Sequence, residues 1–263
     1  MSLYLKPKQM TSYPINFQEG RTLALRAIIF DCDGVLVDSE PLHFSALKKT
    51  LEEAGYLLTE EIYKERYLAN DDKGAFTHFY EDNKYPLTPE NLAILMQKKA
   101  KHFEELVSSE GILPYPAVPE FVMAVSQRYP LAIASGARKH ELEIITETAG
   151  IRSYFESIIS ADDVEKGKPD PESYIKALYA LNNNGKRNSA IRPEECVVIE
   201  DSKEGIKSAH NAGMKCVAVA TSYPAFELAA ADLIVPSISA LRISQMEDLF
   251  QPPAPLPMTS QKN

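Results

Sequence analysis

The sequence predicts an α/β fold in which a doubly wound parallel sheet carries a helical subdomain inserted after its first strand. From Ala24 onward, short apolar runs recur, and each is followed by a stretch of helical periodicity. Between Ser39 and Gly111, helical stretches instead follow one another without a convincing strand. The first pattern is typical of a parallel sheet covered by helices on both faces, and the second indicates an insertion.

Six apolar runs are expected to be strands. They are short, rich in β-branched residues and do not alternate with polar residues, as is typical of strands buried on both faces. The runs are Arg26–Phe30, Leu131–Ala134, Ser157–Ile159, Cys196–Ile199, Cys216–Ala220 and Leu233–Val235.

The helices between these strands have recognisable ends. Asp170 and Pro171 are expected to be an N-cap and the first helical residue, where a proline loses no hydrogen bond. Gly150 and Gly213 lie where helices commonly end in a left-handed residue. Helices and strands therefore alternate regularly outside the insertion.

The insertion is far longer than a normal strand-to-helix loop, since it exceeds 70 residues. Helical stretches such as Leu42–Ala54 and Pro89–Ser108 fill it. Segments near Asp38–Glu40 and Leu113–Pro116 are expected to join it to the rest of the chain as two hinges.

These features predict four regions. We expect residues 24–38 and 113–250 to form the α/β core and residues 39–112 to form a helical domain, called the cap below. Residues 1–23 are polar and aperiodic, and residues 251–263 contain four prolines. Both end segments are expected to be disordered or extended, because they offer little apolar surface to bury.

Composition excludes several classes of protein. The 263 residues include 28 Lys and Arg against 37 Asp and Glu, a net charge of −9, and a chain without a basic block is a poor nucleic-acid binder. Within the body of the chain the longest uncharged stretch, Cys216–Phe226, is too short to span a bilayer. No secretory signal is visible, and Cys32, Cys196 and Cys216 have no metal-binding spacing. We therefore expect buried, reduced thiols in a cytoplasmic protein that binds neither nucleic acid nor membrane.

The first strand is followed by two acids, Asp31 and Asp33, and then by Gly34. A glycine permits a sharp turn, so both carboxylates are expected beyond the carboxyl edge of the sheet, where open α/β folds bind ligands. One can act as a nucleophile or metal ligand and the other as a general acid and base. The alternative is a polar turn in which Asp33 is a local cap.

Polar or charged residues also stand after two other expected strands and within one loop. Ser135 and Gly136 can donate to phosphate oxygens, although Ser135 can equally be a simple N-cap. Glu200 and Asp201 suit Mg²⁺, although Asp201 can instead cap the next helix. Lys168 is followed by Pro169 and Pro171, which hold its loop extended, whereas the alternative is a solvated lysine.

Together these four motifs, DCDGVLVDSE, IASG, GKPDP and VIEDSKEG, resemble those of the haloacid dehalogenase superfamily of phosphotransferases. The similarity extends from about Ala24 to Leu249. The long helical insertion resembles the branch that contains β-phosphoglucomutase and small sugar-phosphate phosphatases.

The resemblance implies a role for each matching residue. Asp31 is then the nucleophile that becomes a phosphoaspartate, and Asp33 protonates the leaving oxygen and later takes a proton from the next nucleophile. Ser135, with Gly136, and Lys168 hold the transferring phosphoryl group.

The same resemblance implies a Mg²⁺ cofactor. Its expected ligands are the Asp31 carboxylate, the Asp33 backbone carbonyl and Asp201, with Glu200 as a direct or water-mediated acid. Charge supports this, because an anionic nucleophile approaches an anionic phosphate only when cations offset the repulsion.

Phosphatases and mutases of this kind share these motifs and differ in the cap. The mutases carry an arginine in an early cap loop, whereas Leu68–Gly74 has acids there and Lys73 one position away. Further candidate substrate contacts are His43, Lys98 or Lys99, and Arg138. Each can instead be an ordinary surface residue.

The interpretation is a Mg²⁺-dependent phosphatase that acts on a small phosphorylated metabolite, most simply a sugar phosphate, as a monomer. A β-phosphoglucomutase-type mutase is the first alternative. A protein that binds a phosphorylated ligand without turnover is the second.

Overall fold

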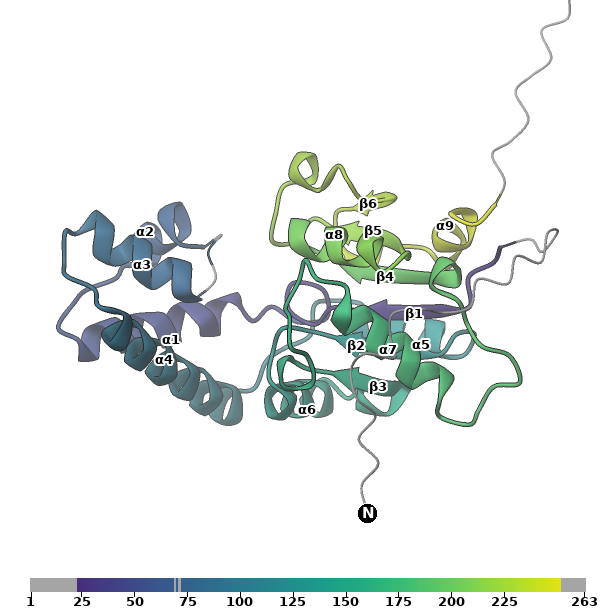
Figure 1. Ribbon diagram of the computed structural model, residues 1–263, viewed down its shortest axis with the longest axis horizontal. Coiled ribbons are helices and arrows are strands. Elements are labelled where there is room, and N and C mark those ends of the chain that lie inside the picture. The colour runs from purple at the N-terminus through teal and green to yellow at the C-terminus, as the bar shows by residue number, and fades with distance from the viewer. Residues whose placement is uncertain (1–22, 69, 71, 252–263) are drawn as a thin grey trace, which may run out of the picture.

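The computed structural model describes residues 23–68, 70 and 72–251, and it confirms the predicted α/β class. A parallel six-stranded sheet has the order β3-β2-β1-β4-β5-β6 (Figure 1). The strands are β1 (Ala27–Phe30), β2 (Leu131–Ala134), β3 (Phe155–Ile159), β4 (Cys196–Glu200), β5 (Lys215–Val219) and β6 (Leu233–Val235). The chain runs outward from β1 to β3 and then restarts on the other side at β4. Ligands of such sheets bind at this reversal, beside β1 and β4.

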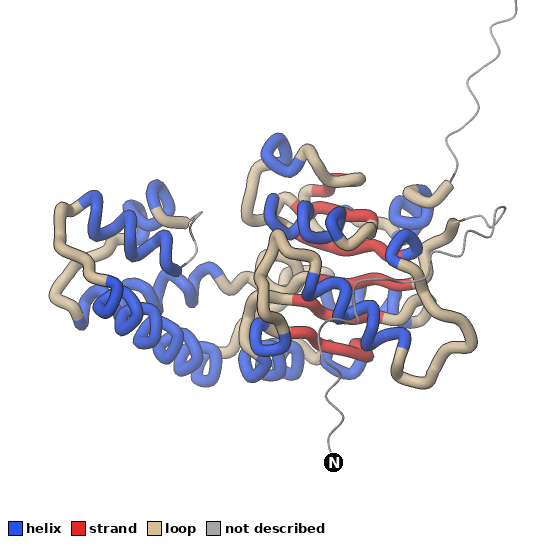
Figure 2. The backbone as a smooth tube through the Cα atoms, viewed as in Figure 1, coloured by secondary structure: helices blue, strands red, loops and turns tan. Residues whose placement is uncertain are grey.

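The helices divide between the core and the inserted cap (Figure 2). The cap holds α1 (Glu40–Glu53), α2 (Glu60–Arg66), α3 (Asp72–Asp82) and α4 (Pro89–Glu110). The core holds α5 (Val118–Ser126), α6 (Lys139–Thr148), α7 (Glu172–Asn182), α8 (Lys203–Asn211) and α9 (Ile243–Asp248). Short 3-10 helices connect them: η2 (Arg152–Tyr154), η3 (Ala161–Asp163), η4 (Pro193–Glu195), η5 (Ala225–Leu228) and η6 (Ile238–Ala240).

Most predicted strands are correct within one or two residues, but one helix start is wrong. Helix α7 begins at Glu172 with Pro171 as its N-cap, not at Pro171 with Asp170 as the cap. The Asp170 carboxylate accepts a hydrogen bond from the Glu172 N–H, so it still stabilises the first turn from one residue further back. Gly150 and Gly213 adopt the expected positive φ angles.

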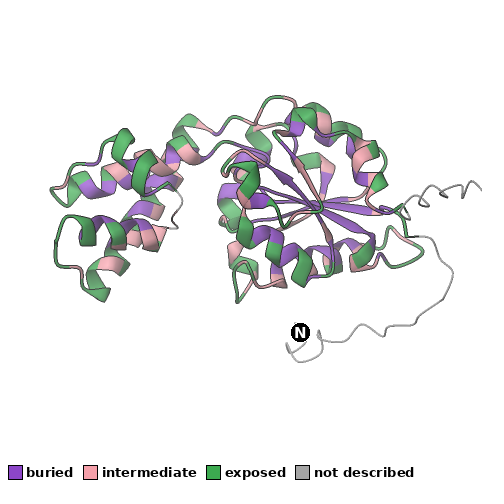
Figure 3. Ribbon diagram, turned by 90° about the horizontal axis from the view of Figure 1, so that it is seen from above, coloured by how far each residue is buried: buried purple, intermediate pink, exposed green. Residues whose placement is uncertain are grey.

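The sheet is buried on both faces because alternate residues of each strand enter different apolar clusters. Phe30 and Ile199 belong to the cluster that includes residues of α5, α6 and α9, whereas Ile29 and Val198 pack with α7 and α8. Figure 3 shows the buried strands in the centre with helices on each side. This arrangement explains why the strands are continuously apolar in sequence.

The cap has its own apolar cluster, built around Leu51, Phe76 and Phe79. Two connecting segments run side by side where cap and core meet. Val37 and Pro114 form an antiparallel bridge, and the Tyr115 N–H donates to the Leu36 carbonyl at 3.0 Å. The expected end segments lie outside the described residues apart from Leu23 and Gln251.

Among the described helices, none combines the length and the apolar character that crossing a bilayer requires. Cys32, Cys196 and Cys216 are free and buried, as predicted.

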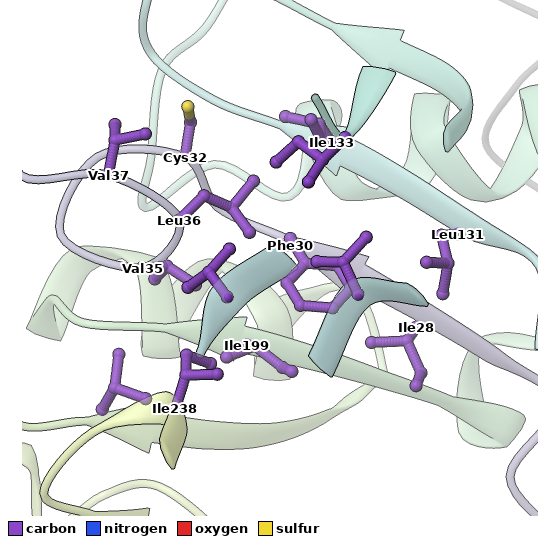
Figure 4. Close-up of a cluster of buried hydrophobic side chains, with 14 of the residues drawn as sticks. Ile28, Phe30, Cys32, Val35, Leu36, Val37, Leu131, Ile133, Ile199 and Ile238 are labelled. Atoms are coloured by element: carbon purple, nitrogen blue, oxygen red, sulfur yellow. The ribbon is translucent and has the colours of Figure 1, made fainter. Parts of the chain in front are cut away.

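Phe30 lies at the centre of the larger core cluster (Figure 4). Its ring makes edge-to-face contacts with Phe155 and Phe121, with centroids 5.7 and 6.4 Å away. Such aromatic contacts add to the free energy gained from burial. Phe30 directly precedes Asp31, so this packing fixes the strand from which the first acid projects.

Replacing Phe30 by alanine is expected to destabilise the fold by about 3–5 kcal/mol, because a fully buried ring is lost and a cavity remains. Urea unfolding measures the change. The matched control is Phe226→Ala, since Phe226 is 78% exposed and its truncation leaves no cavity. A loss below about 1 kcal/mol for Phe30→Ala contradicts the central packing role of this residue.

Candidate active site

The predicted site residues of the core gather at the carboxyl edge of the sheet. The register pairs Phe30 of β1 with Ile133 of β2 and with Ile199 of β4. Asp31, which follows Phe30, donates its N–H to the Ile199 carbonyl at 2.9 Å. The residues that end β2 and β4 therefore reach the same edge as Asp31.

The turn after Asp31 requires a glycine. Gly34 has a φ of +73°, and a Cβ there lies only 1.9 Å from Asp201 Oδ2. Thr221 Oγ1 donates to the Gly34 carbonyl, and Ser222 Oγ donates to Asp201 Oδ2. The turn, Asp201 and the loop after β5 are therefore locked together.

Lys168 is a buried cation between two acids. Its Nζ donates to Asp31 Oδ1 and to Glu200 Oε1, at 2.6 Å in each case, and lies 5.0 Å from the centre of the Tyr174 ring. Burial opposes its charge, but Asp31 and Glu200 outweigh this and raise the pKa of Lys168 above its usual value. The lysine is therefore charged and fixed in place.

Helix α8 holds the loop that carries Lys168. Ser208 Oγ donates to the Asp170 carbonyl at 2.7 Å, and Asn211 Nδ2 donates to the Pro169 carbonyl at 3.0 Å. The alternative of a solvated loop lysine is therefore ruled out.

Glu200 is fully buried, and both of its oxygens accept hydrogen bonds. The donors are Lys168 Nζ and Tyr174 Oη to Oε1, and the Asp201 N–H, the Ser202 N–H and Ser202 Oγ to Oε2. A Cβ on Gly205 lies 1.7 Å from Oε1, so α8 can approach Glu200 only with a glycine at this position. Burial raises the pKa of Glu200, but Lys168 outweighs it and keeps the value below normal.

Asp31, Glu200 and Asp201 form a buried cluster whose carboxylate oxygens lie within 4.8 Å of one another. Burial, with Glu200 nearby, raises the pKa of Asp31 to about 7 although Lys168 opposes the rise. Burial and the charges of Glu200 and Asp31 raise the pKa of Asp201 to about 8. Three carboxylates face one ammonium, so two negative charges are left over when all are ionised. This donor set fits a hard divalent cation.

Asp33 has a buried Oδ1 with no hydrogen-bond partner among the described residues. Burial raises the pKa of this carboxyl, while a hydrogen bond from Ser39 and the charges of Lys168 and Lys99 lower it in part. The raised pKa and the unpartnered oxygen are both in keeping with a general acid and base at this position.

Ser135 lies at the end of β2 and is buried. Its Oγ accepts the Ala137 N–H at 3.0 Å, which leaves the hydroxyl hydrogen able to donate to a ligand. Gly136 is exposed, and a Cβ there meets nothing within 4 Å, so its backbone is open to a ligand.

The candidate residues of the cap form a different group. Lys99 is only 2% exposed, and its Nζ lies 2.6 Å from His43 Nδ1 and 2.7 Å from Asp72 Oδ1. The alternative in which Lys99 and His43 are ordinary surface residues is therefore ruled out, since both are packed against Phe103. Burial and Lys99 lower the pKa of His43 well below normal, so its ring is neutral.

The remaining candidates lie at the border or the surface. Arg138 pairs with Glu104 of α4 at 3.3 Å, which links core and cap. Lys98 pairs with Glu53 at 3.1 Å. Lys73 is exposed on α3.

Sequence reasoning missed Thr221, Ser222, Tyr174 and Gly205 as supports of the acids. Thr221 and Ser222 follow β5, so their position at the end of a parallel strand was a usable signal. No sequence signal indicates the hydrogen bond from Tyr174 to Glu200, because it depends on how α7 packs across the sheet.

A sequence profile of the haloacid dehalogenase-like hydrolase family matches residues 28–219. The chain belongs to this family. A phosphorylated carbohydrates phosphatase of Thermotoga maritima is 32% identical over 73% of this chain and 83% of its own length. The fructose-1-phosphate phosphatase YqaB of Escherichia coli is 28% identical over 73% of this chain and 95% of its own.

Among solved structures, CbbY of Rhodobacter sphaeroides in complex with phosphate shares 27% identity and a TM-score of 0.66, covering 82% of this chain and 95% of that one. A variant of CbbY with bound xylulose-(1,5)bisphosphate has a TM-score of 0.67 and the same identity. Family and relatives agree that the chain is a phosphatase of the haloacid dehalogenase type.

Without added metal, we expect thermal stability to fall as the pH rises through the folded-state pKa values of Asp31 and Asp201, about 7 and 8. Both values lie above the ordinary 3.8, so the folded state holds more protons than the unfolded chain between these limits. Raising the pH removes those protons and leaves repelling charges in the buried cluster.

Calorimetric melting in the presence of a chelator, at roughly pH 6 to 9, tests this linkage. Asp201→Asn is the control, because it cannot ionise and is expected to flatten the dependence. A melting temperature that is constant or rises over this range rules out the raised pKa values.

Proposed function

We propose that this chain is a Mg²⁺-dependent phosphatase that hydrolyses a small sugar phosphate through a phosphoaspartate on Asp31. The observation that carries the proposal is the buried arrangement in which Lys168 bonds Asp31 while Asp33 keeps a free oxygen. A nucleophile, a cation and a separate acid are thereby present at one edge of the sheet. The family membership and the sugar-phosphate phosphatases among the relatives support the same reaction.

In the first step, a carboxylate oxygen of Asp31 attacks phosphorus, and the bond between phosphorus and the sugar oxygen breaks. Asp33 gives its proton to that oxygen, so the sugar leaves as a neutral alcohol. Lys168 and the Ser135 hydroxyl donate to the phosphoryl oxygens and offset the charge that gathers on them.

In the second step, water attacks the phosphoaspartate. Asp33, now ionised, takes a proton from this water, and inorganic phosphate leaves as the Asp31 carboxylate is restored. Asp33 ends the cycle protonated, so proton transfers balance without an external acid.

Mg²⁺ would be held by the carboxylates of Asp31 and Asp201 and by the backbone carbonyl of Asp33, with Glu200 next to them. When bound, the ion supplies positive charge that lets an anionic carboxylate approach an anionic phosphate. Glu200 already accepts hydrogen bonds on both oxygens, so its main contribution is to hold Lys168 and the backbone of Asp201.

Asp31→Asn is expected to abolish phosphate release without unfolding the protein, because the amide is a poor nucleophile of the same shape. Phosphate release from a panel of sugar phosphates, including β-glucose 1-phosphate, measures this, and the melting temperature verifies folding. Substantial turnover by the folded variant rules out the covalent mechanism.

The same assay separates phosphatase from mutase when glucose 6-phosphate is followed by a coupled enzyme. Free phosphate with no glucose 6-phosphate supports the proposal. Glucose 6-phosphate without free phosphate identifies a mutase and overturns it.

Asp201→Ala is expected to weaken Mg²⁺ binding by at least one to two orders of magnitude, because losing a residue that only supports a ligand already costs about 10- to 100-fold in metal affinity. Calorimetric titration with Mg²⁺ measures the affinity directly. Glu204→Ala is the control, because this acid is exposed on α8. An unchanged affinity in Asp201→Ala removes Asp201 from the ligand set.

A further inference from the structure

Lys99 is a cation of the cap whose charge acts on Asp33, the proposed proton donor. It is buried on α4, and its charge is one of the influences that lower the pKa of Asp33. Its Nζ also bonds His43, near the start of α1 and the hinge. The ammonium therefore lies on the side of the cap that faces the reacting groups.

Asp72 neutralises this ammonium. Its Oδ1 lies 2.7 Å from Lys99 Nζ, and its side chain is 41% exposed whereas that of Lys99 is 3% exposed. Asp72 is the first residue of α3, where the helix dipole favours a negative charge. Figure 1 shows that α3 begins at the end of the cap that faces the core. The accessible member of this pair is thus the acid.

A cation on the core side of this border is also paired. Arg138, just beyond Ser135 and Gly136, is bound to Glu104. Glu40, at the hinge, is a further acid near Lys99, and it accepts a hydrogen bond from Tyr63. Lys99 and Arg138 are therefore both paired with acids, and Glu40 adds a further acid near Lys99.

Resting on the proposed function, we propose that Asp72 is a specificity-determining residue that restricts the enzyme to monophosphates of uncharged sugars. The Asp72 carboxylate is exposed and accepts hydrogen bonds while the buried Lys99 behind it offsets its charge, which suits sugar hydroxyls. A second phosphate meets the exposed carboxylate of Asp72 instead of a free ammonium. Such repulsion selects against the wrong substrate.

The test compares kcat/KM for fructose 1-phosphate and fructose 1,6-bisphosphate, with p-nitrophenyl phosphate as a substrate that has no sugar. The wild type is expected to prefer the monophosphate. Asp72→Asn is expected to raise the bisphosphate-to-monophosphate ratio by about tenfold, because one negative charge is removed and Lys99 is released. Adding Lys99→Met to Asp72→Asn is expected to cancel this gain.

Glu81→Gln is the matched control, since it removes one charge from an exposed residue of the same helix. It is expected to leave the ratio unchanged. A ratio that does not move in Asp72→Asn, or a wild type that prefers the bisphosphate, overturns the role of Asp72.

Failure of the proposed function is a separate outcome. If the wild type hydrolyses none of the three substrates, phosphatase action on these esters is refuted. Calorimetric binding of the same two sugar phosphates to the Mg²⁺-loaded protein then gives the ratio without turnover, and the same criteria decide the role of Asp72.

Discussion

The buried ion pairs of Lys168 with Asp31 and Glu200 are the interactions on which the rest of the site depends. Two carboxylates at adjacent strand ends repel each other in a buried position, and the ammonium between them offsets that repulsion. Glu200 tolerates full burial because every direction around its oxygens is used by a donor. Gly205 approaches Glu200 closely, and α8 forms hydrogen bonds with the loop that carries Lys168. Both features keep the buried charges in position. Much of the α7–α8 face is thus organised around one lysine.

The charge of Asp201, which Lys168 does not neutralise, explains the structure of the site around Ser222 and the turn at Gly34. Asp201 is held by Ser222, and the turn at Gly34 fits against it so closely that a side chain there is excluded. A fold selected for stability alone gains little from collecting like charges in this way. Preorganised charge at the point where a dianionic group reacts is instead what phosphoryl transfer requires. Because gathering these like charges costs free energy of folding, their arrangement indicates a functional role.

The fold class and the acids of the core were predictable for one physical reason. Parallel strands end at a common edge, so polar residues that follow separate apolar runs must meet, as Asp31, Ser135 and Glu200 do. The start of α7 was misplaced because Asp170 bonds the N–H two residues ahead, and sequence does not distinguish this from an N-cap. The burial of Lys99 was also missed. Its partners His43 and Asp72 come from two other helices, and only their packing shows that the lysine does not face solvent.

The division between core and cap gives the enzyme two separate electrostatic tasks. In the core, cations are needed because the transferring group is always the same anion. In the cap, a free cation would attract any second anion. In the proposed specificity, pairing Lys99 with Asp72 removes that attraction, while the exposed Asp72 carboxylate still accepts hydrogen bonds from hydroxyls. Yet the charge of Lys99 also lowers the pKa of Asp33, the proposed proton donor. In the proposed mechanism, a substrate group that disturbs the pair therefore also alters the environment of Asp33, so that selection of the sugar and proton transfer to it depend on one ammonium group.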